Sequence, residues 1–205
     1  MNNQIRSTVI SVIFVGQNGV GKTSLINNYL DNASNEYFFS TLFPDYYQKI
    51  IKDEGNDYRI RLWDTPGTER FINMIRPYLR NVKVVVLVFD MTRKESFLFL
   101  DKVLEIAFEF FVDINKVMFI LIGNKSDLRD KWEIKESDAK KFADILHAKF
   151  YLSSAKDEPR LFQEFLDGAF LDIFKKFNEE LNNPERRINL NPINRRRPRQ
   201  RMFCI

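Results

Sequence analysis

The segment Gly16-Gln-Asn-Gly-Val-Gly-Lys-Thr23 constrains the fold more strongly than any other part of this 205-residue chain. It follows the β-branched run Thr8–Val15, which predicts a short buried strand, and it leads into Lys22–Leu30, which predicts a helix. Its spacing matches G-x-x-x-x-G-K-[ST], a loop whose glycines let successive backbone N–H groups turn inward. The helix that follows points the positive end of its dipole at the same place. We therefore expect nucleotide phosphates to be bound by Asn18, Gly19, Val20, Gly21, Lys22, Thr23 and Ser24.

Two side chains of this loop carry specific chemistry. Lys22 is expected to reach the β- and γ-phosphates as a mobile point charge. The Thr23 hydroxyl is expected to ligate Mg²⁺, a hard ion that prefers oxygen. The alternative interpretation is a glycine-rich turn that binds nothing, and the strand before the loop and the helix after it favour the nucleotide.

The chain up to residue 177 alternates strand and helix patterns. Continuous apolar strands separated by helices indicate a mostly parallel sheet covered on both faces, and one hairpin around Glu54–Asp57 adds an antiparallel edge. The sequence thus predicts an α/β fold. The predicted strands are Thr8–Val15, Tyr47–Lys52, Tyr58–Trp63, Lys83–Phe89, Val117–Ile122 and Phe150–Leu152. The predicted helices are Lys22–Leu30, Glu69–Arg80 with an interruption at Pro77, Ser96–Phe111, Ser137–Leu146, and a last one with an apolar stripe from Leu161 to Phe177.

Composition excludes several classes of protein. A single cysteine, Cys204, cannot form a disulfide framework within the chain, and we expect a reducing compartment. No apolar run approaches the roughly 18 residues that would span a bilayer, and the N-terminus lacks a signal-peptide pattern. The net charge of +4 lies entirely in residues 178–205, which hold seven Arg and three Glu. We expect residues 1–177 to form one domain and residues 178–205 to be a flexible basic tail.

A second motif, Asn124-Lys-Ser-Asp127, follows the predicted strand Val117–Ile122 and so lies where open α/β sheets bind ligands. The Asp127 carboxylate can accept hydrogen bonds from the N1–H and 2-amino groups of guanine, a donor pair that adenine lacks. Asn124 can brace neighbouring loops, and the Lys125 stem can cover the base. After the last strand, backbone N–H groups of Ser154, Ala155 and Lys156 can meet the guanine O6.

A third segment, Trp63-Asp-Thr-Pro-Gly-Thr-Glu-Arg70, follows the second strand of the hairpin. Asp64 can hold Mg²⁺ through water, and the Gly67 N–H can contact a γ-phosphate. Thr41, within Ser40–Tyr46, can supply a second hydroxyl to the metal. The candidate metal ligands are therefore Thr23, Thr41 and Asp64.

These segments, in this order, resemble the Ras superfamily of small GTPases, and the Rab branch most closely. Further segments that resemble Rab sequences are Arg80–Val82, Val88–Thr92, Ile122–Leu128 and Ala139–Ala143. The resemblance covers about residues 6–177. It implies the three-layer P-loop GTPase fold, with a six-stranded, mostly parallel sheet flanked by five helices. It further implies a GTP/GDP switch with Mg²⁺, in which hydrolysis involves Lys22, Thr41, Gly67 and Thr68 and the nucleotide is also contacted by Phe38.

The resemblance also implies partners and a place of action. Effectors, an exchange factor and a GTPase-activating protein would read the switch segments, on a surface we expect to include Phe39, Leu42, Phe43, Trp63, Phe71 and Tyr78. A monomer is expected, cycling from the cytoplasm onto the cytosolic face of intracellular membranes and acting in vesicle traffic.

The sequence departs from the family at three positions that bear on the chemistry. Thr68 stands where a Gln usually orients the attacking water, so slow unassisted hydrolysis is predicted. Pro66 replaces the usual Ala and removes a backbone donor, and Phe43 replaces a glycine of the first switch. A GTP-binding module with negligible hydrolysis therefore remains an alternative.

The tail combines five arginines in residues 195–201 with Cys204. Prenylation of Cys204, with the arginines attracted to anionic lipid, would anchor the chain to a membrane. The cysteine is not four residues from the end, so the C-a-a-X signal is absent, and an unmodified basic tail is the other interpretation. A less favoured alternative is an ATP-using P-loop protein whose tail binds nucleic acid, and we expect no nucleic-acid partner because aromatic residues are not interleaved with the arginines.

Overall fold

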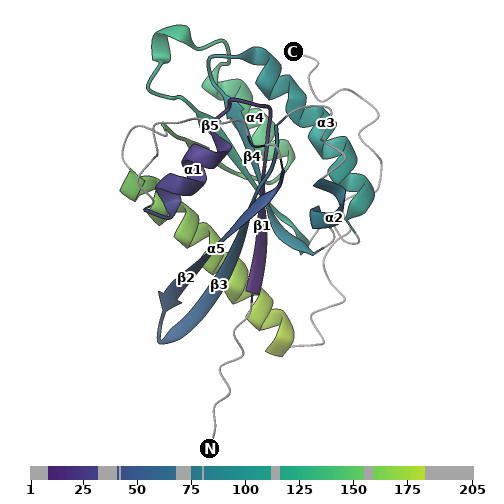
Figure 1. The fold of residues 1–205 in the computed structure, drawn as a ribbon, viewed down its shortest axis with the longest axis vertical. Coiled ribbons are helices and arrows are strands. Elements are labelled where there is room, and N and C mark those ends of the chain that lie inside the picture. The colour runs from purple at the N-terminus through teal and green to yellow at the C-terminus, as the bar shows by residue number, and fades with distance from the viewer. Residues whose placement is uncertain are drawn as a thin grey trace, which may run out of the picture.

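The computed structural model describes residues 9–31, 41, 43–67, 75–79, 81–111, 116–154 and 159–182. Its centre is a six-stranded sheet in the order β2-β3-β1-β4-β5-β6 (Figure 1). Every neighbouring pair is parallel except β2 and β3, which form an antiparallel hairpin at one edge. The strands are β1 (Val9–Val15), β2 (Asp45–Asp53), β3 (Asn56–Asp64), β4 (Val82–Asp90), β5 (Met118–Asn124) and β6 (Lys149–Leu152).

Helices cover both faces of the sheet and give the three layers that the sequence predicts. One apolar cluster joins the sheet to α1 and α5, and a second joins its other face to α2, α3 and α4. The stripe on α5 supplies Phe162, Leu166, Phe170 and Phe174, all buried, to the first cluster. The helices are α1 (Lys22–Tyr29), α2 (Arg76–Leu79), α3 (Lys94–Phe110), α4 (Glu136–Ile145) and α5 (Pro159–Asn182).

The predicted elements differ from the observed ones mainly at their ends. Within the predicted helix Glu69–Arg80, the described part is helical only over Arg76–Leu79, with Pro77 in the first turn, where its missing N–H costs nothing. Helix α5 continues to Asn182, so the regular structure extends five residues beyond the predicted end at Phe177. The division into domain and tail remains a prediction, because residues 183–205 lie outside the described part.

The parallel arrangement creates the site. The carboxyl ends of β1, β3, β4, β5 and β6 all lie along one edge of the sheet, because each of these strands runs parallel to its neighbour. The segments that follow these strands therefore meet at that edge, although they are far apart in sequence. All three motifs singled out above are among them.

Candidate nucleotide-binding site

The phosphate loop between β1 and α1 has the backbone that its glycines permit. Gly19 and Gly21 have φ values of 77° and 98°, in the left-handed region that favours glycine. A Cβ on Gly21 would also collide with Nδ2 of Asn124, so the Asn124–Asp127 motif packs directly against the phosphate loop. Asn18 and Gly19 are exposed at the tip of the loop, where a ligand can reach their backbone.

Lys22 is buried beneath this loop. Its Nζ donates hydrogen bonds to the carbonyl oxygens of Gly16, at 3.0 Å, and Gln17, at 3.2 Å. Burial lowers the pKa of Lys22 to about 8, with the Asp64 charge opposing that shift and the Arg93 charge adding to it. The side chain is thus held in the loop as a cation at neutral pH.

The three predicted metal ligands converge. The Thr23 hydroxyl donates to Oδ2 of Asp64 at 2.5 Å and lies 3.1 Å from the Thr41 hydroxyl, which is itself 3.3 Å from Oδ2 of Asp64. Burial raises the pKa of Asp64, against the hydrogen bonds from the two hydroxyls and the charge of Lys22. The other carboxylate oxygen, Oδ1, is buried and has no hydrogen-bond partner among the described residues.

A hard divalent cation fits this arrangement. One carboxylate and two hydroxyls are oxygen ligands, and the orphaned Oδ1 of Asp64 would gain the partner it lacks. The described residues contain no cluster of three or more His, Cys, Asp or Glu. An ion held here would therefore complete its shell with water and phosphate, which is how Mg²⁺ is usually bound.

The predicted base-recognition residues lie at the ends of β5 and β6. Nδ2 of Asn124, a buried side chain, donates to the carbonyl of Val20 at 2.7 Å, which braces the phosphate loop as the sequence predicts. Asp127 is exposed in the same turn. The turn is fixed to the end of β6, because the Ser126 N–H donates to the Ser153 carbonyl at 3.1 Å.

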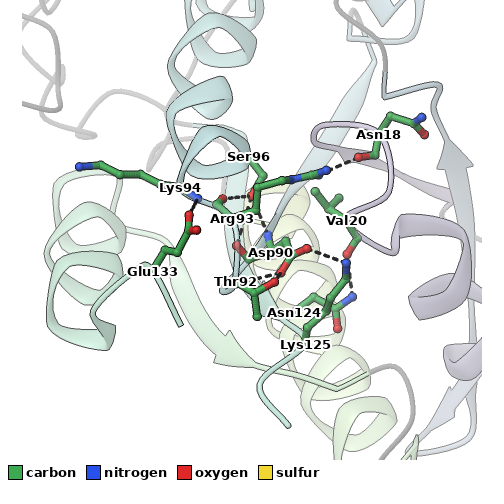
Figure 2. A network of polar contacts seen from close by, with 10 residues as sticks. All are labelled: Asn18, Val20, Asp90, Thr92, Arg93, Lys94, Ser96, Asn124, Lys125 and Glu133. Atoms are coloured by element: carbon green, nitrogen blue, oxygen red, sulfur yellow. Dashed lines mark hydrogen bonds and ion pairs between the residues drawn. The ribbon is translucent and has the colours of Figure 1, made fainter. Parts of the chain in front are cut away.

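Sequence reasoning missed Asp90, at the end of β4. Figure 2 shows its carboxylate between Lys125, at 2.6 Å from Oδ2, and Thr92, whose hydroxyl and N–H donate to Oδ1 at 2.7 Å and 2.9 Å. Burial alone would raise the pKa of Asp90, but these donors together outweigh it and hold the pKa below its usual range. The sequence signal that could have identified Asp90 is a single carboxylate at the end of an otherwise apolar strand, next to the strands that lead into the two ligand-binding loops.

Lys125 is drawn into the site by this carboxylate. Its backbone takes a positive φ of 61°, which is uncommon for a residue with a side chain. The ion pair with Asp90 fixes the ammonium end of this side chain.

The segment after β3 lies against the phosphate loop. The Thr65 hydroxyl donates to the Phe14 carbonyl at 2.6 Å, and Pro66 is buried beside it. Gly67 packs so closely on the backbone of Gln17 and Asn18 that a Cβ there would overlap them. A glycine is therefore required next to the place where the sequence predicts the terminal phosphate.

Outside the described residues lie the site residues Phe38, Thr68, Ala155 and Lys156, the surface residues Phe39, Leu42 and Phe71, and Cys204 of the tail. The described members of the predicted nucleotide set all lie at the edge of the sheet where the carboxyl ends of the strands meet.

An aromatic row lies beside this edge, on the hairpin and α2. The ring of Trp63 is 5.3 Å from that of Tyr46 and 4.6 Å from that of Tyr78, measured between centroids. Tyr46 is 53% exposed, and the nearby Phe43 is 71% exposed. Trp63, Tyr78 and Phe43 were predicted as partner-facing, whereas Tyr46 was not singled out.

Comparison with known proteins identifies the family. A model of the Ras family matches residues 11–176. The chain is a Rab-like member of that family. It is 32% identical over 176 residues to the GTP-binding protein ypt1 of Schizosaccharomyces pombe, an alignment that covers 85% of this chain and 83% of that protein. It is 35% identical over 168 residues to the Ras-related protein Rab-12 of Mus musculus and of Homo sapiens, covering 82% of this chain and 68% of each relative.

Membership of this family confirms the predicted class of protein. As a Rab-like small GTPase, the chain binds GTP and GDP, hydrolyses GTP, and belongs to the machinery of membrane traffic, with regulators and effectors as partners. The alternative of an ATP-using protein with a nucleic-acid-binding tail finds no support. Among the described residues, no helix is long and apolar enough to cross a bilayer.

Proposed function

We propose that this Rab-like GTPase holds its nucleotide along the edge formed by the carboxyl ends of the strands, with the phosphates in the loop of residues 16–23 and the guanine beside Asp127. The observation that carries the proposal is the meeting of Thr23, Thr41 and Asp64 next to the buried Lys22. These four residues come from three segments, and a purely structural role would not require three hydroxyl or carboxylate groups to share one point.

The phosphates are bound by the loop and its lysine. Backbone N–H groups of the loop supply neutral donors, while Lys22 supplies a full positive charge from a dry position, where the attraction is stronger than in water. Mg²⁺, when bound, would neutralise phosphate charge and would be held by Thr23, Thr41 and Asp64.

Selection of the base rests on Asp127. Its carboxylate is exposed at the end of β5, where it can accept from the two guanine donors. Asn124 ties this turn to the phosphate loop through the Val20 carbonyl. Binding of the base and binding of the phosphates are therefore mechanically linked.

Hydrolysis without help is proposed to be slow. Thr68 stands where the family's Gln positions the attacking water, and its hydroxyl has a shorter, branched stem. A Rab-type activating protein can supply the missing groups in trans, so assisted turnover survives in this scheme. The alternative, a module that binds GTP and barely hydrolyses it, differs only in this step.

The exchange factor, activating protein and effectors are proposed to engage the exposed rings of Tyr46 and Phe43, together with the half-buried Trp63 and Tyr78 beside them. Exposed aromatic groups often mark interaction surfaces. We further propose that the protein acts as a monomer and cycles onto the cytosolic face of intracellular membranes. The basic tail, with Cys204 either prenylated or unmodified, supplies the attraction to lipid.

The proposal is tested by identifying the nucleotide that co-purifies with the intact chain and by competing GTP against ATP. We expect guanine nucleotide, displaced by GTP and not by ATP, and an Asp127→Asn variant that shifts its preference towards xanthine nucleotides. Predominantly bound GTP would favour the module with negligible hydrolysis, and bound GDP a cycling enzyme. Absence of guanine-nucleotide binding at micromolar concentration in the presence of Mg²⁺ would refute the site.

A further inference from the structure

Arg93 directly precedes α3 and belongs to none of the three sequence motifs of the nucleotide site. Its backbone is fixed on both sides: its N–H donates to the Asp90 carbonyl at 3.0 Å, and its own carbonyl accepts from the Ser96 hydroxyl at 2.7 Å. The neighbouring Lys94 N–H donates to Glu133 at 2.8 Å. The Arg93 side chain therefore projects from a turn that cannot easily shift.

The guanidinium of Arg93 reaches the tip of the phosphate loop (Figure 2). Nη2 donates to the Asn18 carbonyl at 2.7 Å, across 75 positions of sequence, and Nη1 lies beside Gly19. Nε is buried and has no hydrogen-bond partner among the described residues. A positive charge is thus held against the two loop residues most open to solvent.

This contact acts on a particular peptide group. The carbonyl of Asn18 and the N–H of Gly19 belong to one planar peptide unit, so a cation bonded to the oxygen polarises the N–H at the other end. Hydrogen bonds in which one partner is charged are about twice as strong as neutral ones. The Gly19 N–H consequently becomes a stronger donor and is fixed in direction, on the loop that holds phosphate.

The same turn also contacts the base-recognition loop. Asp90, whose carbonyl holds the Arg93 N–H, binds Lys125 through its carboxylate. Lys125 adjoins Asn124, which donates to the Val20 carbonyl. The turn between β4 and α3 therefore joins both halves of the site (Figure 2).

We propose that Arg93 is a positioning residue for the bound phosphates, which acts by polarising and orienting the Asn18–Gly19 peptide and by adding positive potential at the loop. The inference rests on the proposed nucleotide site. It states that the retention of nucleotide in this GTPase depends on the cation of Arg93, in the turn before α3, as well as on Lys22. Arg93 should increase the affinity for GTP more than the affinity for GDP, because the additional phosphate of GTP brings more negative charge to the loop.

The test compares Arg93→Met, Arg93→Lys and Lys94→Met in the full chain. The last variant is the matched control, because it removes the same charge one residue away, from a side chain directed away from the loop in Figure 2. The measurements are the dissociation rate of fluorescently labelled GDP with Mg²⁺ present and the ratio of GTP to GDP affinity. We expect dissociation from Arg93→Met to be about tenfold faster, equivalent to about 1.4 kcal/mol, with a lower GTP-to-GDP affinity ratio.

The Lys variant distinguishes a role in positioning from one in packing. Lysine keeps the charge and can still donate to a carbonyl, but it lacks the planar fork of the guanidinium. The GDP dissociation rate of Arg93→Lys should therefore stay within about threefold of that of the unmodified protein. Lys94→Met should stay within twofold. The inference is overturned if GDP dissociates equally fast from Arg93→Met and from the unmodified protein. It is also overturned if Arg93→Lys and Arg93→Met accelerate dissociation equally, or if the ratio of GTP to GDP affinity does not change.

Failure of the nucleotide site and failure of the variant to fold can each be told apart from failure of the inference. If the unmodified chain binds no guanine nucleotide, the proposed site itself fails, whereas normal binding with a silent Arg93→Met defeats only the present inference. Should Arg93→Met not yield folded protein by circular dichroism, Arg93→Gln replaces it, since glutamine keeps a neutral donor. GDP must then dissociate faster from Arg93→Gln than from Arg93→Lys. The reverse order of the two rates would refute the role of charge.

Discussion

Replacement of Asn124 by alanine tests the link between the two halves of the site. In the structure its Nδ2 donates to the Val20 carbonyl at 2.7 Å, and the side chain is only 1% exposed. Loss of a buried neutral hydrogen bond that leaves its acceptor unpaired costs about 1–3 kcal/mol. We take about 2 kcal/mol as the expected loss in the nucleotide-bound protein, and this corresponds to roughly a 30-fold faster release of GDP if all of it appears in the dissociation rate.

The assay is the release of labelled GDP in excess unlabelled GDP and Mg²⁺, with circular dichroism to verify folding. Asn124→Asp should release GDP faster than Asn124→Ala. A carboxylate cannot donate to the Val20 carbonyl, and its negative charge would face the partial negative charge of the carbonyl oxygen. Asn56→Ala is the control: its amide also donates to a backbone carbonyl, that of Glu54 at 3.4 Å, but in an exposed turn. That variant should leave the rate of GDP release within twofold of the unmodified rate, because its bond lies in an exposed turn of the hairpin.

The reasoning is refuted if Asn124→Ala releases GDP within twofold of the unmodified rate, or if Asn124→Asp matches the unmodified chain. Either result would mean that the bond to Val20 contributes nothing to retention. The tight approach of Asn124 to Gly21 would then be a matter of packing alone.

Three other predictions concern the metal, the hydrolysis and the pH dependence. Asp64→Ala should make GDP release insensitive to EDTA, since the carboxylate that accepts from both Thr23 and Thr41 is gone. A full EDTA response would show that the metal is held elsewhere. Thr68→Gln should raise the single-turnover rate of unassisted GTP hydrolysis at least tenfold, and a strong fall with Thr68→Ala would instead give the native hydroxyl a role. Burial and, after it, the Glu105 charge raise the pKa of Asp101 to about 6, so protonation of the folded state stabilises it as the pH falls from about 6 to 4. In urea unfolding, Asp101→Asn should therefore be the more stable protein at pH 7 and lose that advantage by pH 4; an equal difference at both pH values would contradict the shift.

The order of strands and helices could be predicted from the sequence because it depends on local patterns. The apolar runs of β1, β4 and β5 are continuous since both faces of these strands are covered, and the stripe on α5 repeats at helical spacing. The turn at Glu54 and Gly55, with φ values of 46° and 79°, matches the hairpin signal. Helix ends were less predictable: α5 continues to Asn182 although its apolar stripe stops at Phe177.

The site was predictable to the extent that its residues occur in motifs. The residue types of the phosphate loop and of the turn at Asp127 specify their chemistry over a few positions, because the chemistry is carried by backbone donors and single side chains. Arg93 escaped notice because nothing near it in sequence marks a ligand. Asp90 and Tyr46 lie within family-like segments, but only the structure shows the ion pair of Asp90 with Lys125 and the packing of Tyr46 on Trp63.

By itself, the amino-acid sequence determined the class of the fold, the phosphate loop and the base-recognition motif, since each depends on residues within about ten positions of one another. The motifs also predicted that Thr23 and Asp64 meet, across 41 positions, as ligands of one metal. Only the tertiary structure decided which backbone carbonyls the other side chains bind: Arg93 that of Asn18 across 75 positions, and Asn124 that of Val20 across 104. The physical reason is that parallel strands bring their carboxyl ends to a common edge. Which of the residues beyond each strand then touch depends on packing and register over the whole sheet, and no local pattern encodes that.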